Sequence, residues 1–228
     1  MTGDYDRRVA TGFEGFRDSP DAPFYCAAGM SAEDTWLEAT DRLRRVLTDV
    51  EDEARHRPIA VSGERICRWH RAIFSTTFAR DAGRIRGDHE PVWFVIRVAR
   101  GDGSVGSRLV EGTSGRREIE DQLGLACERF NSARRSVEGR RAATPATEAI
   151  RIAAGLYSDL LRIHPFVDGN LRAAFVALQA GLRSLRLPGV SFGRVLDRHD
   201  DAIGWAIRGD QDRTDEPLTA LLAELMSA

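Results

Sequence analysis

The most informative segment of the chain is Ile163-His164-Pro165-Phe166-Val167-Asp168-Gly169-Asn170-Leu171-Arg172. A helix is expected to end at Ile163, because the proline at position 165 disfavours helical backbone in the residue before it. A second helix is expected to begin near Gly169 and Asn170. The short loop between these helices holds a histidine, a carboxylate and a glycine, and an arginine follows in the first turn of the second helix.

These residue types in this order are suited to the transfer of a phosphoryl or nucleotidyl group. The amides at a helix start favour phosphate oxygens, and Gly169 lets a ligand approach the backbone closely. Asp168 is the kind of single carboxylate that binds Mg²⁺ together with substrate phosphates. Arg172 has a planar fork that matches a terminal phosphate. His164, with an ordinary pKa of roughly 6.5, is suited to accept a proton from an attacking hydroxyl. Taken singly, His164 is as compatible with a buried structural histidine, and Asp168 with a helix cap.

The composition is that of a globular protein of ordinary domain size. Of the 228 residues, 42% are hydrophobic and 30% are charged, which excludes a disordered or fibrous chain. The 33 basic residues are outnumbered by 35 acidic ones, so binding to nucleic acid is not expected. Every basic residue is an arginine, which is typical of a GC-rich bacterial genome and excludes lysine-based chemistry such as a Schiff base.

The sequence predicts a cytoplasmic protein, or one delivered from the cytoplasm into a host or target cell. No apolar run approaches the roughly 18 residues of a membrane helix, so no membrane association is expected. The polar start of the chain does not resemble a secretory signal. The three cysteines, Cys26, Cys67 and Cys127, lack paired spacing, which indicates reduced thiols and not a disulfide framework or a zinc site.

Hydrophobic periodicity predicts a mainly α fold with one β-hairpin. Helices are expected over residues 31–55, from about residue 62, and over 116–130, 147–163, 170–185 and 217–226. Strands are expected over residues 91–98 and 104–110, joined by a glycine-containing turn. The first 30 residues are expected to be irregular.

The loop resembles the signature of Fic domains, HPFx(D/E)GNGR, which is matched at His164, Pro165, Phe166, Asp168, Gly169, Asn170 and Arg172. Residues 69–74 and 82–86 also resemble the upstream helix of that family and the stretch leading into its flap. Residues 206–210 and 217–222 resemble the usual close of the domain. The resemblance implies a Fic-type helical bundle with a short β-hairpin flap over residues 61–228. Residues 1–60 would form an N-terminal extension of irregular chain plus one helix.

Through this resemblance the chain is expected to be a Mg²⁺-dependent protein adenylyltransferase. Such an enzyme moves AMP from ATP to a Tyr, Thr or Ser hydroxyl of a target protein. The resemblance implies that His164 is the base that activates the hydroxyl, that Phe166 anchors the loop in the core, and that Asp168 binds Mg²⁺.

The resemblance also assigns the phosphate site and the partners. Gly169 and Asn170 would form the anion hole, Leu171 would lie among the nucleotide-binding residues, and Arg172 would hold the β- and γ-phosphates. The hairpin, from about residue 87 to 110, would bind the target protein by strand addition. An antitoxin-like regulator is a further partner of the kind that this family uses.

Two residues depart from the family pattern and keep alternatives open. Leu171 stands where most members have a second glycine, and Doc-type toxins, which carry a lysine there, transfer the γ-phosphoryl group instead. A Doc-like protein kinase is therefore one alternative, and a non-catalytic interaction module with a closed anion hole is another. Phe175 stands where many members have an arginine that pairs with an inhibitory glutamate, so inhibition by Glu111 or Glu14 is not expected. Two further classes have less support. The slightly negative net charge argues against a DNA-binding regulator, and the missing HExxH motif argues against a metal hydrolase.

Overall fold

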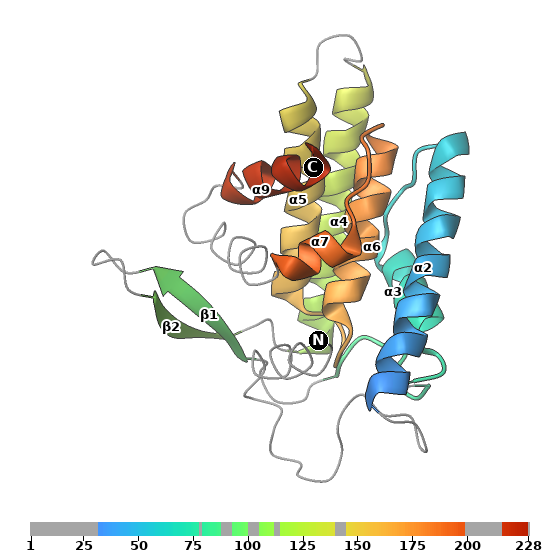
Figure 1. Cartoon of the computed structure of the whole chain (residues 1–228), viewed down its shortest axis with the longest axis vertical. Coiled ribbons are helices and arrows are strands. Elements are labelled where there is room, and N and C mark those ends of the chain that lie inside the picture. The colour runs from blue at the N-terminus through green and yellow to red at the C-terminus, as the bar shows by residue number, and fades with distance from the viewer. Residues whose placement is uncertain are drawn as a thin grey trace.

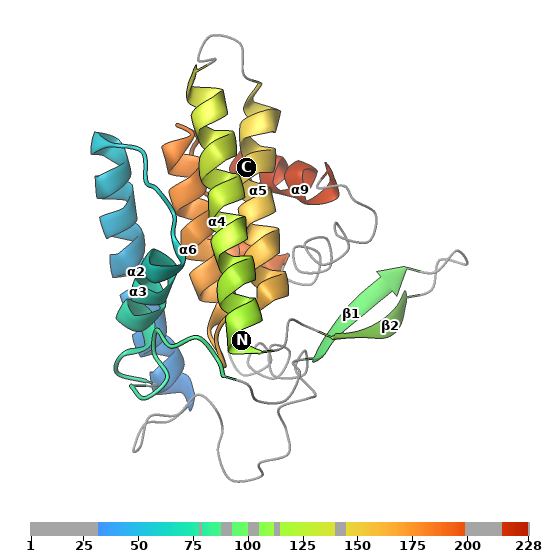
Figure 2. The same cartoon turned by 180° about the vertical axis from the view of Figure 1, so that it is seen from behind.

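The computed structural model describes residues 32–77, 79–87, 93–99, 105–111, 115–139, 145–198 and 216–227. Three long helices form the centre of the bundle and lie side by side in both views (Figures 1 and 2). They are α4 (Arg116–Gly139), α5 (Ala146–Ile163) and α6 (Asn170–Ser184). The predicted fold class, mainly α with a short hairpin, is confirmed.

Helix α6 is the core helix of the bundle. Twelve of its fifteen residues are buried, and most of them are alanine, leucine, valine or phenylalanine. A helix that is apolar on nearly every side has to be surrounded. It packs between α5 and α2 (Ala32–His56), so the start of α6 is held rigidly at the lower end of the bundle in Figure 1.

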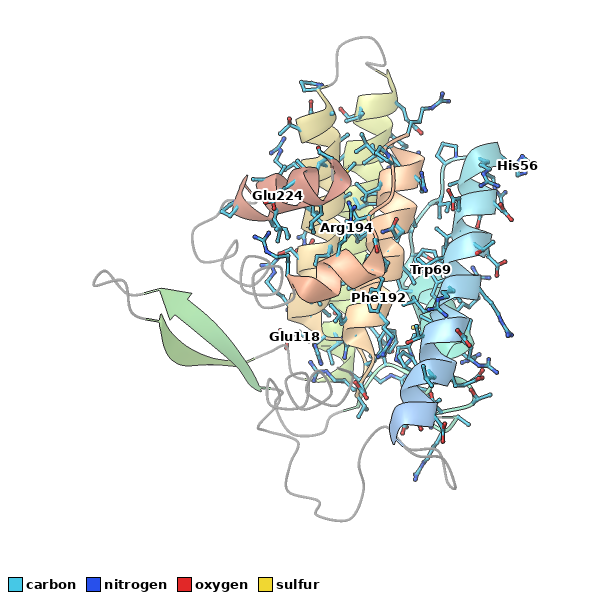
Figure 3. All side chains as sticks on the ribbon, in the orientation of Figure 1. His56, Trp69, Glu118, Phe192, Arg194 and Glu224 are labelled. Carbon is cyan, nitrogen blue, oxygen red and sulfur yellow. The ribbon has the colours of Figure 1, made fainter. Side chains whose placement is uncertain are left out.

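Helices α2 and α3 (Gly63–Phe74) cover the side of α6 that lies opposite α5. The buried face of α2 joins the main hydrophobic core through Ala39, Leu43, Val46 and Val50. Ser62 caps α3 by accepting a hydrogen bond from the Arg65 amide. Trp69 lies between α3 and α2, as Figure 3 shows. The predicted division at residue 60 stays a prediction, although α2 shares one core with the helices that follow it.

Buried side chains fasten the connecting segments to the bundle through paired hydrogen bonds with the backbone. The Asn131 amide donates to the Val61 carbonyl at 2.6 Å and accepts from the Val61 N–H at 3.1 Å. Gln179 pairs in the same way with Val190. Each pair satisfies backbone groups that have no partner in a helix or sheet.

The hairpin extends away from the helices (Figures 1 and 2). Strand β1 (Trp93–Ala99) pairs antiparallel with β2 (Val105–Glu111), with Trp93 opposite Glu111 and Ala99 opposite Val105. The ends of both strands agree with the predicted strand ends to within two residues. The turn that joins the strands lies outside the described residues.

Two helices close the C-terminal side of the bundle. Helix α7 (Phe192–Asp197) and helix α9 (Glu216–Ser227) are joined by a hydrogen bond of 3.0 Å from Arg194 Nη1 to the Leu225 carbonyl. Arg198 also forms an ion pair of 3.0 Å with Glu224. Figure 3 shows Arg194 and Glu224 on this side of the molecule.

The predicted helices agree with the structure except in two places. Helix α4 was predicted to end at Phe130 but continues to Gly139. The polar run after Phe130 stays helical because Asn131 binds the backbone of Val61 and because Arg134, which is buried, pairs with Glu138. The six-residue α7 was not predicted at all. No helix in the described part of the chain is long and apolar enough to span a bilayer.

Candidate functional site

The candidate site lies on the loop that joins α5 to α6. His164 directly follows α5, and its N–H donates to the Leu160 carbonyl at 3.0 Å. Its φ of 50° and ψ of 61° place it in the left-handed region. For a residue with a side chain this conformation costs roughly 1–2 kcal/mol. The surrounding structure therefore has to hold His164 in place.

Arg86 holds the backbone at His164. Its guanidinium donates through Nε to the His164 carbonyl at 2.6 Å and through Nη2 to the Ile163 carbonyl at 3.2 Å. The Arg86 N–H also donates to the Pro165 carbonyl at 2.9 Å. Only 4% of Arg86 is exposed. Its positive charge thus lies at the C-terminus of α5, where the helix dipole favours a cation.

The imidazole of His164 is neutral at physiological pH. Burial, the largest cause, and the charge of Arg86 together lower the pKa of His164 to about 3, against a hydrogen bond with the Leu161 backbone that raises it. A neutral imidazole has one nitrogen that donates and one that accepts. His164 is therefore in the protonation state that a general base requires.

His70 of α3 holds the loop in place through hydrogen bonds and ring stacking. Its Nδ1 accepts the Gly83 N–H at 2.8 Å, and its Nε2 lies 2.8 Å from the Asp168 carbonyl. Because an amide donates and a carbonyl accepts, the proton is on Nε2. Burial, the largest cause, lowers the pKa of His70 to about 4. The ring also stacks on Phe166, with 3.8 Å between the ring centroids.

Asn170 closes the loop on itself. Its Oδ1 accepts the Phe166 N–H at 2.8 Å, and its Nδ2 donates to the Phe166 carbonyl at 2.8 Å. Phe166 is fully buried. The Asn170 side chain is thus used for the shape of the loop, which leaves its backbone N–H as the group that Asn170 can offer to a phosphate.

Gly169 allows the loop to pack against α3. Its φ is 74°, and a Cβ at this position would lie 2.2 Å from Phe74 Cε2 and 3.0 Å from His70 Nε2. The sequence suggested that this glycine makes room for a ligand. In the structure its bare side faces the rings of α3, so the glycine is required by packing and by backbone conformation.

The residues predicted to bind phosphate and metal lie at the start of α6. Helix α6 has no side-chain cap at its N-terminus. Asp168 is half-buried, and its Oδ1 accepts the N–H of Gly169. Arg172 is half-buried, and its guanidinium carbon lies 5.9 Å from the centre of the Phe74 ring. The loop therefore brings a carboxylate, an arginine and the first amides of a helix to one place.

Leu171 packs against the main hydrophobic core. The sequence left open whether its side chain would fill the mouth of the helix. Packing against the core is a structural reason for a leucine at position 171, where the signature has its second glycine.

Asp168 fits a site for Mg²⁺ that the substrate completes. In the part of the chain that the structure describes, no three His, Cys, Asp or Glu side chains gather into a metal site. Mg²⁺ is usually bound by one or two carboxylates together with substrate phosphates. One carboxylate beside an uncapped helix start matches that requirement.

Position 175 is a phenylalanine and offers no positive charge that could pair with an inhibitory glutamate. Phe175 is fully buried and its ring lies 4.8 Å from that of Phe192. Glu111 is the last residue of strand β2 and lies opposite Trp93, one residue beyond the predicted end of the strand. Glu14 lies outside the described residues.

Sequence reasoning did not identify the roles of His70 and Arg86. His70 lies in the segment 69–74, and the resemblance of that segment to the upstream helix of the family was the available signal. Arg86 lies in the segment 82–86 that resembles the family, but nothing near it in the sequence indicates its partners, because Ile163 and His164 are more than 75 residues away.

Solved structures that carry Fic domains are similar to this chain in fold. A Fic-domain signalling protein from Bacteroides thetaiotaomicron is 17% identical, with a TM-score of 0.59 over 88% of this chain and 71% of its own. Residues 134–508 of Fic-1 from C. elegans are 18% identical, with a TM-score of 0.57 over 88% of this chain and 51% of that one.

Some of these structures contain a nucleotide. BepC, a VirB-translocated effector of Bartonella tribocorum solved with bound AMPPNP, is 18% identical, with a TM-score of 0.55 over 88% of this chain and 95% of its own. No curated protein sequence matches the chain. The sequence model of the Fic/DOC family matches residues 60–182, which include α3, the hairpin and the whole α5–α6 loop. The chain therefore belongs to the Fic/DOC family, whose members are generally transferases.

Proposed function

We propose that the protein transfers AMP from ATP to a Tyr, Thr or Ser hydroxyl of a target protein. The observation that carries this proposal is the arrangement of the α5–α6 loop. A neutral, buried imidazole at the end of α5 is followed within eight residues by Asp168, by an uncapped helix start and by Arg172. Transfer of this kind depends on positioning and on charge neutralisation.

In the proposed reaction His164 takes the proton of the acceptor hydroxyl. The hydroxyl oxygen then forms a bond to the α-phosphorus, the bond between the α-phosphorus and the bridging oxygen breaks, and pyrophosphate leaves. Burial of His164 keeps its imidazole in the neutral form, which can accept this proton.

The phosphates are proposed to bind at the start of α6. The backbone N–H groups after Gly169, at Asn170 and Leu171, face no capping side chain and are suited to phosphate oxygens. Arg172 would hold the β- and γ-phosphates through its planar fork. Asp168 would hold Mg²⁺, which when bound neutralises charge on the phosphates.

The packing of Leu171 supports AMP transfer over the two alternatives. A leucine across the helix start would block the phosphates or force the nucleotide to bind in the reverse orientation, as proposed for a Doc-like kinase. Leu171 instead packs against the core. This packing is the observation that we weigh in favour of AMP transfer over phosphoryl transfer or a non-catalytic role.

The target protein is proposed to bind along the hairpin. A two-stranded sheet has an outer edge on each strand, and such edges accept an extended peptide through main-chain hydrogen bonds. Binding of this kind would align a hydroxyl without requiring a particular target sequence. An antitoxin-like protein that covers the same hairpin would compete with the target.

Labelled ATP tests the proposed reaction. The protein is incubated with a cell lysate and with ATP labelled either at the α- or at the γ-phosphate. AMP transfer predicts that only the α-label becomes attached to protein. Attachment of the γ-label alone would replace the proposal with a kinase. The absence of both labels, together with no binding of Mg²⁺-ATP in calorimetry, would favour the interaction module.

A further inference from the structure

We propose that Arg86 is a positioning residue for the transfer reaction. It holds the backbone of the proposed base, His164, from the segment that leads into the hairpin. The inference deepens the proposed function and rests on it for the role of His164. The contacts of Arg86 are a property of the free protein, and they are tested separately below.

The geometry explains why an arginine is needed here. The last carbonyls of α5 have no partner within the helix. One guanidinium serves two of them, at His164 and Ile163, with two N–H groups in a fixed plane. With the bond from the Arg86 N–H to Pro165, three consecutive carbonyls are bound by one residue. A lysine has a single nitrogen and no such fork.

The position of Arg86 links the base to the hairpin. Strand β1 begins at Trp93, seven residues after Arg86. The same short segment contains Gly83, whose N–H is bound by His70, the residue that also holds the Asp168 carbonyl. The segment before the hairpin is therefore hydrogen-bonded to both ends of the loop, at His164 and, through His70, at Asp168.

Arg86 also sets the charge around the base. Its charge acts on the His164 imidazole and lowers the pKa together with burial, against the hydrogen bond with the Leu161 backbone, which raises it. His70 of α3 and Asp168 of the loop, which also titrate, are joined by a hydrogen bond to the Asp168 backbone carbonyl. A variant without the charge of Arg86 should consequently bind a proton at His164 more readily.

Two variants separate the geometry from the charge. Arg86→Lys keeps a positive charge but loses the fork, and Arg86→Gln loses the charge. Arg194→Gln is the matched control, because Arg194 also binds a carbonyl at a helix C-terminus, that of Leu225, but on α9, away from the loop. Two measurements on the free protein follow: hydrogen exchange of the His164 amide, and titration of its ring by NMR with His164→Gln for assignment.

In both Arg86 variants we expect exchange of the His164 amide, which is bonded to Leu160, to become about 10- to 100-fold faster, the effect of losing a charge-assisted hydrogen bond. Exchange of the Ala173 amide, bonded to Gly169, should not change. The pKa of His164 should rise in Arg86→Gln and stay low in Arg86→Lys. Arg194→Gln should match the wild type in every respect.

Unchanged exchange and titration at His164 in both Arg86 variants would overturn the inference. If Arg86→Gln does not fold, the exchange pattern of Arg86→Lys decides the question. In the transfer assay, Arg86→Lys should lower kcat with little change in the KM for ATP, because the phosphate site lies on α6. The wild-type protein could transfer no label while the Arg86 variants still change exchange and titration at His164 as expected. That result would reject the proposed function and keep the role of Arg86 in holding His164.

Discussion

The Nε2 atom of His70 lies 2.8 Å from the carbonyl oxygen of Asp168 and donates a hydrogen bond to it across 98 residues of sequence. Helix α3 thereby fixes the part of the loop that is proposed to bind metal and phosphate. The same ring stacks on Phe166, so the loop is supported through its backbone and through its buried side chain.

Replacement of His164 by alanine is expected to reduce AMP transfer by about 10²- to 10⁴-fold, the usual effect of losing a general base. The affinity for Mg²⁺-ATP should be retained, because the proposed phosphate contacts are on α6. Transfer is measured with α-labelled ATP, and affinity by calorimetry. A variant with full transfer activity would remove His164 from the proposed mechanism.

Replacement of Arg172 by alanine is expected to weaken binding of Mg²⁺-ATP by roughly 10- to 100-fold, because a charge-assisted contact to phosphate is lost. Turnover should fall as well. Arg172→Lys is the matched variant, since it keeps the charge without the planar fork. Its affinity for Mg²⁺-ATP should lie between those of the wild type and Arg172→Ala. Calorimetry checks both. Wild-type affinity in Arg172→Ala would show that the phosphates bind elsewhere.

Replacement of Gly169 by alanine is expected to destabilise the protein by about 2–5 kcal/mol. The left-handed backbone costs roughly 1–2 kcal/mol and the overlap with Phe74 a further 1–3 kcal/mol. Gly124→Ala is the control, because no atom lies within 4 Å of a Cβ at that position on α4, and it should stabilise the protein by roughly 0.5–1 kcal/mol. Urea unfolding measures both. Equal stability of the two variants would contradict the close packing on α3.

The free energy of unfolding is expected to fall below about pH 6.5. The folded chain binds a proton at His70 only near pH 4 and at His164 only near pH 3, because burial disfavours the charged rings. The unfolded chain binds both protons near the ordinary histidine pKa of about 6.5. Stability is therefore complete above that pH and is lost as the pH falls, by up to about 1.4 kcal/mol per pH unit for each histidine.

Urea unfolding at about pH 7.5 and 5.5 checks this, with an expected loss of roughly 2–3 kcal/mol. His164→Gln should lose about half as much over the same interval, because one of the two buried rings is gone. His56→Gln is the control, since His56 is exposed at the end of α2 and points into solvent in Figure 3. A loss of the same size in wild type and His164→Gln would show that His164 is not buried in its neutral form.

The elements of the fold followed from local patterns where those patterns were strong. Apolar periodicity located α2, α3, α5 and α6, and the proline at 165 marked the end of α5 at Ile163. The end of α4 was missed, because the helix is extended by contacts with a distant segment, such as that between Asn131 and Val61. Helix α7 is too short to show a period.

The loop residues were identified from sequence, but their supports were not. The order of His164, Asp168, Gly169 and Arg172 is local and could be recognised. The bonds of His70 and Arg86 join segments nearly 80 or more residues apart, and no pattern within one segment indicates them. The orientation of Gly169 toward Phe74 likewise depends on where α3 packs.

The shared core of α2 and α6 has a practical consequence for anyone who shortens this chain. The family match starts at residue 60, which invites expression of the protein from that point onward. Such a fragment would lack the apolar face formed by Ala39, Leu43, Val46 and Val50, and it would expose the flank of α6 to water. It would also lose the ion pairs of Glu51 with Arg183 and of Glu53 with Arg65. We expect that fragment to aggregate, whereas one beginning at the start of α2 keeps the flank covered.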